Sequence, residues 1–167
     1  KMNIKLLFLC LILFGINIVY ADNGEPMDVF GEWTVFRTVE NRKTFCYMMN
    51  IPQNKSSNIL KRGEPFFLVI KEKGKRYPEI NLSTGFQISN RANSAEIEVN
   101  NKLFPLITRY DQAWAYSIEN DVSIINLLGK NAIFVVSAFS ESGERSVDVY
   151  SLLGFSEAYR AINKLCK

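Results

Sequence analysis

Short apolar runs separated by turn residues constrain the fold of this chain more than any other feature of its sequence. The runs are rich in β-branched and aromatic residues, and several alternate with a period of two. In residues 95–99 the small and apolar side chains face one way, whereas Glu96 and Glu98 face the other. Many short strands of this kind are typical of a β-sandwich or barrel. Strands are predicted at about 33–39, 45–50, 66–72, 79–83, 86–89, 95–99, 103–108, 113–118, 132–139 and 146–151.

Turn residues divide these strands. Asn100-Asn101 suits a tight hairpin turn, because asparagine tolerates positive φ, and Ser142-Gly143 indicates a second hairpin. Residues 52–65 form the longest irregular stretch, and we expect a mobile or binding loop there.

Two helices are predicted in addition to the strands. Asp121 can cap a short helix that Gly129 closes. Ser156 can cap a C-terminal helix over 157–165. An i, i+4, i+7 spacing gives that second helix an apolar stripe made of Ala158, Ile162 and Leu165.

The first 21 residues have the order of a secretory signal peptide. Lys1 and Lys5 are followed by an apolar run over 6–19 and by a cleavage-site pattern ending at Ala21. A transmembrane anchor is the alternative, but it needs about 20 apolar residues. We therefore expect residues 1–21 to be cleaved, leaving residues 22–167 as one domain without a membrane anchor.

The charge composition is nearly balanced, with 20 Lys and Arg against 17 Asp and Glu. This balance does not support nucleic-acid binding. The basic run Lys71-Glu72-Lys73-Gly74-Lys75-Arg76 is a local exception. It is typical of a solvated hairpin turn, and its alternative role is contact with an anionic lipid or glycan.

Two cysteines remain after removal of the expected signal peptide. Cys46 and Cys166 lie far apart in an exported chain, a pattern that predicts one disulfide. Two buried thiols, or one reactive thiol, are the alternatives. Neither cysteine has a CxxC partner, so a redox or zinc site is a poor fit.

Catalytic, cofactor and metal motifs are missing from the sequence. It contains no histidine, which removes the commonest general base and most zinc sites. Glu96 and Glu98 could form a carboxylate pair, although such acids are usually a solvated strand face. Lys130 with a nearby serine is the other catalytic alternative. Trp33 and Trp114 are expected in the core. The sequence therefore predicts no catalytic, cofactor-binding or metal-ligating residue.

A series of motifs resembles the invasion-associated locus B family of secreted alphaproteobacterial proteins. The resemblance spans residues 29–167, and its most specific part is the run from Asp148 to Phe155 followed by a helix that ends in cysteine. The motifs, in order, are Phe30-Gly31-Glu32-Trp33-Thr34-Val35, Lys43-Thr44-Phe45-Cys46-Tyr47, Pro52, Arg62-Gly63, Glu79-Ile80, Gly85-Phe86, Ala113-Trp114, Ser140-x-Ser142-Gly143, Asp148-x-Tyr150-Ser151-Leu152-x-Gly154-Phe155 and Cys166.

The resemblance implies an immunoglobulin-like β-sandwich located in the periplasm, at the outer membrane or outside the cell. It also implies a contribution to entering or colonising host cells, and it defines no catalytic residue. The leading hypothesis is a non-enzymatic envelope or secreted protein that binds an unidentified envelope or host-surface partner and no cofactor, with peripheral membrane association left open. The alternatives are a periplasmic enzyme that uses carboxylates or a Ser-Lys pair, and an envelope assembly factor or chaperone.

Overall fold

The computed structural model describes residues 25–167, which form twelve strands and two helices. The predicted signal peptide, residues 1–21, lies outside the described residues. The fold is mainly β, as the sequence predicts, with two antiparallel sheets and a C-terminal helix. No helix within residues 25–167 is long and apolar enough to cross a membrane.

The larger sheet has seven strands in the order β1-β2-β3-β5-β6-β10-β9. Neighbouring strands pair antiparallel throughout, and β2, β3 and β5 form its centre. The strand bounds are Glu25–Phe30 for β1, Trp33–Glu40 for β2, Lys43–Asn50 for β3, Phe66–Glu72 for β5, Glu79–Ser83 for β6, Ile107–Arg109 for β9 and Gln112–Trp114 for β10.

The smaller sheet has five strands in the order β4-β12-β11-β7-β8. Its long central pair, β11 and β12, is antiparallel and in register over seven residues. The bounds are Asn54–Ser57 for β4, Ala95–Val99 for β7, Lys102–Pro105 for β8, Ile133–Phe139 for β11 and Arg145–Ser151 for β12.

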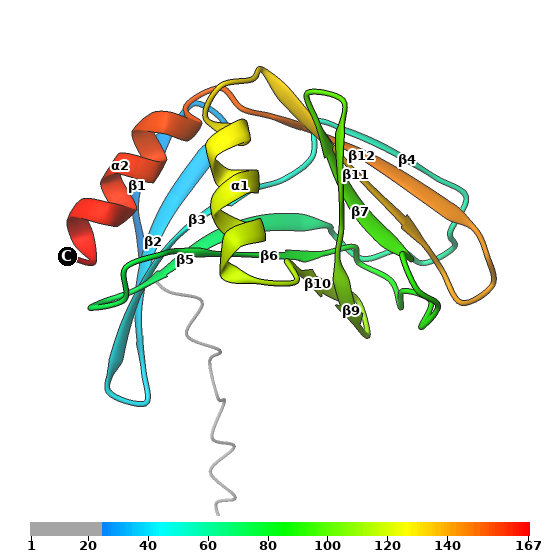
Figure 1. Ribbon diagram of the computed structural model, residues 1–167, viewed down its shortest axis with the longest axis horizontal. Helices are drawn as coiled ribbons and strands as arrows, with labels where there is room; N and C mark the ends of the chain where they lie inside the picture. The colour runs from blue at the N-terminus through cyan, green and yellow to red at the C-terminus, as the bar shows by residue number, and fades with distance from the viewer. Residues whose placement is uncertain (1–24) are drawn as a thin grey trace, which may run out of the picture.

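One face of the seven-stranded sheet, here called the inner face, is covered over most of its strands. The helix α2 (Phe155–Leu165) packs on β1, β2, β3 and β5, while α1 (Ile118–Leu128) contacts β6 and β7. Figure 1 shows both helices and the five-stranded sheet on this same side. Within residues 25–167, neither a helix nor the second sheet lies on the opposite face of β2, β3 and β5, here called the outer face.

Aromatic side chains fill the space between the layers. Trp33 packs edge-to-face on Phe155 at 5.1 Å, and Phe67 meets Phe134 at 4.8 Å in the same way. Phe134 in turn stacks on Tyr150. All five side chains are buried, so this cluster joins both sheets and α2 into one core.

Two close approaches connect segments that are distant in the chain. Arg62 binds both carboxylate oxygens of Asp148 on β12 and donates from Nε to the Thr84 carbonyl after β6, which ties the two sheets together. Gly154 has a φ of 86°, and a Cβ there would collide with the Phe30 carbonyl oxygen. Only glycine fits that crossing without strain.

Several predictions from the sequence are confirmed in detail. Trp33 is fully buried. Both asparagines of the 100–101 turn adopt positive φ, and so does Gly143 in the second hairpin. The strands Phe66–Glu72, Glu79–Ser83 and Ala95–Val99 have the predicted bounds.

Other strand predictions are wrong. The predicted strand at 103–108 is two strands, β8 and β9, which belong to different sheets because the chain crosses between sheets at Leu106. Residues 86–89 form only an isolated bridge from Ile88 to Ser140. The strand predicted at 113–118 ends at Trp114, which is half-buried on the outer face instead of in the core. Two strands were not predicted because their sequences are polar: β4, which lies inside the predicted loop at 52–65, and β1, which lies at the start of the described residues.

Both predicted helix caps are also wrong. Ser117 caps α1, accepting a hydrogen bond from the Asn120 N–H, and the helix therefore starts three residues before Asp121. Gly154 occupies the N-cap position of α2, where no side-chain hydrogen bond is made. Phe155 starts that helix because burial against Trp33 stabilises its first turn.

Candidate functional site

The predicted disulfide joins Cys46 on β3 to Cys166 at the end of α2, with the two Cα atoms 5.8 Å apart. Both cysteines are completely buried, as is the Ala158 and Ile162 face of α2. A buried disulfide has no access to a thiol partner, so its role here is to hold α2 on the inner face.

The two catalytic alternatives find no assembled site. Glu96 and Glu98 lie on the strand β7, where Glu98 is exposed and neither makes an ion pair with any described residue. Lys130 lines the same shallow hollow as Ser156, but no hydrogen bond joins it to a serine within residues 25–167. Neither arrangement activates a nucleophile.

Buried carboxylates are present but already have partners. Asp148, 1% exposed, is bound by Arg62, and Asp121 accepts the Ile80 N–H at 2.8 Å. Burial raises the pKa of Asp121 to about 6, the Ile80 hydrogen bond opposes that rise, and the nearby Glu79 adds to it. The two carboxylates lie in different parts of the fold and share no cavity among those found in the described residues.

One hollow contains two other acids, Glu64 and Asp111, in a volume of about 460 Å³. Glu64 binds the Lys55 ammonium, and Asp111 accepts a hydrogen bond from the Ser83 hydroxyl at 2.7 Å. No group of three or more potential metal ligands occurs within residues 25–167. These acids therefore have structural partners and are not arranged as an acid–base pair.

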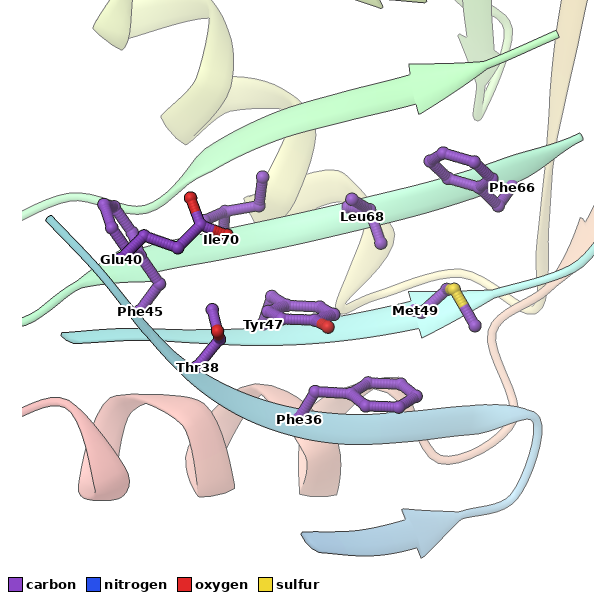
Figure 2. Close-up of a pocket in the computed structure, with 9 residues that line it drawn as sticks. All are labelled: Phe36, Thr38, Glu40, Phe45, Tyr47, Met49, Phe66, Leu68 and Ile70. Atoms are coloured by element: carbon purple, nitrogen blue, oxygen red, sulfur yellow. The ribbon is translucent and has the colours of Figure 1, made fainter. Parts of the chain in front are cut away.

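The strongest candidate site is a groove on the outer face of β2, β3 and β5, with a volume of about 650 Å³. These strands are apolar on both faces, so the side chains that do not enter the core line the groove. Figure 2 shows them rising from the three strands on one side of the sheet. The lining residues are Phe36, Thr38, Glu40, Phe45, Tyr47, Met49, Phe66, Leu68 and Ile70.

Cross-strand pairing places these side chains in a continuous row. Phe36 is paired with Tyr47, and their rings stack 5.0 Å apart at an angle of 10°. Met49 is paired with Leu68 on the next strand, and Tyr47 with Ile70. Three adjacent strands span about 10 Å, which sets the width of the apolar floor.

Polar groups are concentrated at one end of the groove. Figure 2 shows Glu40 beside Phe45 and Ile70, at the opposite end from Met49 and Phe66. Glu40 is exposed and makes no ion pair with any described residue. Thr38, paired with Phe45, is only 8% exposed, and its buried hydroxyl oxygen has no hydrogen-bond partner within the described chain.

A neighbouring acid at this end is already neutralised. Glu72 binds Lys43 and Lys75, each with an N–O distance of 3.0 Å. Hydrogen bonds from Lys75 and then Lys43 lower the pKa of Glu72 below its usual value. Lys43 is the cross-strand neighbour of Glu40, but its ammonium is bound to Glu72. Glu40 is thus the carboxylate at the groove end that makes no ion pair with a described residue.

The basic run at 71–76 is engaged within its own hairpin. Lys71 is buried and donates to the Arg76 carbonyl, and the Arg76 guanidinium lies 5.1 Å from the centre of the Tyr77 ring. Lys75 binds Glu72, as described above. These contacts favour the solvated-turn interpretation over a site for anionic lipid or glycan.

Three of the four edge strands carry features that disfavour pairing with another chain, and the fourth, β9, is only three residues long. In β1, Pro26 has no N–H, a bulge follows it, and the Asp28 carboxylate accepts the Val29 N–H. The edge strand β4 is polar and carries Lys55, and β8 carries Lys102 and Pro105. Such features discourage strand addition, so the outer groove is the better candidate for contact.

Sequence reasoning missed this groove, although the signal was visible. The run Phe66–Ile70 is apolar at every position, and Phe45–Met49 is nearly so. A continuous apolar run indicates a strand that packs on both faces. Such a run predicts a strand, but it does not predict what covers the second face of that strand.

Comparison with known proteins gives a structural match. No family model matches the sequence, and no curated protein matches it either. The fold matches the crystal structure of invasion associated protein b from Bartonella henselae, with a TM-score of 0.57 and 15% identity over 83% of this chain and 95% of that one. The resemblance found in the sequence motifs is therefore confirmed at the level of the fold that this chain shares with invasion associated protein b.

Proposed function

We propose that this chain is an exported, non-enzymatic binding protein of the bacterial envelope or cell surface, which contributes to host-cell invasion or colonisation. The observation that carries the proposal is the apolar groove on the outer face of β2, β3 and β5. Large aromatic and aliphatic side chains gathered on an open face are typical of interaction sites.

Export is part of the proposal. Residues 1–21 would be the cleaved signal, residues 22–167 the mature domain, and the destination the periplasm, the outer membrane or the medium. The buried disulfide supports this destination, because such bonds persist in oxidising compartments. The shared fold with an invasion associated protein supports the host-related role.

Binding of the purified mature domain, residues 22–167, tests the function directly. We expect saturable binding of fluorescently labelled protein to outer-membrane vesicles or to cultured host cells. Unlabelled protein should compete, and heat-unfolded, reduced protein should not. Binding that never saturates on either surface would reject the proposal, as would turnover in a hydrolase screen that disappears on changing Glu64 or Asp111 to the amide.

A further inference from the structure

We infer that the outer groove binds a segment of a partner protein that presents a row of large apolar side chains ending in a lysine or arginine. This inference rests on the proposed function and adds the chemistry of the partner. It is carried by three features of the groove: its apolar floor, its unpaired carboxylate and its unpartnered hydroxyl.

The apolar floor suits a polypeptide segment. The row formed by Phe36, Tyr47 and Ile70 crosses three strands, a width of about 10 Å. That width equals the diameter of a helix with its side chains. The outward side chains of β3 and β5 are half-buried, so the surface that they form is uneven. A partner's side chains would pack between them.

The charge at the groove end selects a basic group. Glu40 is unpaired, while Glu72 is held by two lysines and needs no further cation. A lysine or arginine at the end of the partner's apolar row would pair with Glu40 across a partly desolvated edge, where such pairs fix register and specificity. Lys43 and Lys75 also lie at this end, but both are bound to Glu72. An anionic lipid headgroup would therefore meet the unpaired Glu40 carboxylate and two ammonium groups that are already engaged, which favours a peptide over a lipid as the occupant.

Thr38 supplies a second polar contact close to Glu40. Its hydroxyl is buried and lacks a hydrogen-bond partner among the described residues. A buried hydroxyl without a partner is unfavourable. Its oxygen is enclosed in the free protein, so a partner group that enters the groove and displaces the surrounding side chains would gain free energy by bonding to it. Together, Thr38 and Glu40 define the polar end of the apolar row.

A peptide library tests this chemistry without assuming the partner's identity. We would select a phage-displayed library of random 12-residue peptides against the immobilised mature domain. The expected peptides share at least two large apolar residues and a lysine or arginine at a fixed spacing from them. Enriched peptides that lack a basic residue, or no enrichment at all, would overturn the inference.

Substitutions then locate the binding site. Leu68→Lys places a charge in the middle of the groove and should raise the Kd of an enriched peptide at least tenfold. Glu40→Gln should raise it about three- to tenfold and reduce its dependence on salt. The matched control is Leu103→Lys, because Leu103 is an exposed leucine on β8 of the other sheet, and we expect no change in Kd.

Two further measurements keep the test decisive. If Leu68→Lys does not fold, as judged by circular dichroism, Leu68→Ala and Phe36→Ala replace it and should each weaken binding.

Phosphatidylglycerol vesicles are added as a competitor. If the vesicles bind the domain and this binding depends on Leu68, the groove is assigned to lipid and the inference is overturned. Surface binding that is unaffected by Leu68→Lys would reject this inference while leaving the proposed function intact. If the wild-type domain binds the selected peptides but binds neither outer-membrane vesicles nor host cells, the proposed function is rejected instead.

Discussion

The two faces of β2, β3 and β5 are built from similar side chains but have different neighbours. The inner face buries Trp33, Cys46 and Phe67 under α2 and the second sheet, whereas the outer face leaves Phe36 and Leu68 half-buried. An apolar face that the chain itself covers contributes to stability, and one that it leaves open is available for contact. Substitutions on the inner face should therefore change folding, and those on the outer face should change binding.

The largest expected effect comes from the disulfide on the inner face. Its cysteines are 120 residues apart, and closing so long a loop stabilises a fold by about 4–5 kcal/mol in the chain-entropy model, an upper value. Changing both Cys46 and Cys166 to serine should lower the free energy of unfolding by up to that amount, as measured by urea denaturation.

The same double variant should loosen α2 before the rest of the domain. Limited proteolysis should cut first after Ser156, since the disulfide and the apolar face of α2 hold this helix on the sheet. At low temperature, the double variant should still bind the peptides that the phage library enriches. A loss of peptide binding while the sheet remains folded would show that the two faces are not independent.

Adjacent phenylalanines provide the sharpest comparison of the two faces. Phe67 is 0% exposed in the core, whereas Phe66 next to it points to the outer groove. Phe67→Ala should cost about 3–5 kcal/mol of stability. Phe66→Ala should cost about 1 kcal/mol, because its side chain is half-exposed. Thermal and urea unfolding of both variants measure the difference, and equal costs would contradict the distinction between the faces.

The sequence predicted the inner face better than the outer one. Trp33, the disulfide and the Ala158 and Ile162 positions of the stripe on the last helix follow from apolar pattern and cysteine number, since burial acts on each element locally. The third predicted stripe residue, Leu165, is exposed instead. The outer groove depends on which second face stays uncovered, and this is decided by where α2 and the five-stranded sheet pack. The division of 103–108 between two sheets was also hidden, because a change of sheet at one buried residue, Leu106, leaves no break in the apolar pattern.

Carboxylates on the two faces should respond to pH with opposite sign. Burial raises the pKa of Asp121, on α1 at the inner side of the sheet, from 3.8 to about 6, so the folded state binds a proton more tightly than the unfolded chain. Stability should therefore fall as pH rises from about 4 to about 6, by at most about 3 kcal/mol. Lysines lower the pKa of Glu72 on the outer face, and its contribution is present above its unfolded pKa and lost as pH falls.

Asp121→Asn separates these two contributions. Asparagine can still accept the Ile80 N–H, and it carries no charge to desolvate. The fall in stability between pH 4 and 6 should disappear from urea-denaturation curves of this variant. If the wild-type protein instead gains stability steadily across this range, Asp121 is not the dominant titrating group.

The smallest expected effects come from two buried hydroxyls that have no hydrogen-bond partner within residues 25–167, one on each side of the sheet. Tyr150 lies in the core between the two sheets, and Thr38 lies in the groove. An unsatisfied buried hydroxyl costs about 1–3 kcal/mol, so its removal should not destabilise the fold. Tyr150→Phe should raise the free energy of unfolding by about 1 kcal/mol, as measured by urea denaturation.

Thr38→Val removes the other hydroxyl and keeps the shape and β-branching of the side chain, so it should also raise stability slightly, by about 0.5–1 kcal/mol. The two variants should differ in binding. Both hydroxyl oxygens are enclosed in the free protein. Tyr150 lies in the core, so Tyr150→Phe leaves the groove unchanged, while Thr38 lines the groove, where side-chain shifts on binding would expose its hydroxyl to a partner. Affinity for an enriched peptide should fall about three- to tenfold for Thr38→Val, the equivalent of about 1 kcal/mol, and stay constant for Tyr150→Phe. If both variants bind as the wild-type protein does, the Thr38 hydroxyl makes no contact with the partner, and the groove recognises it through apolar contact and Glu40 alone.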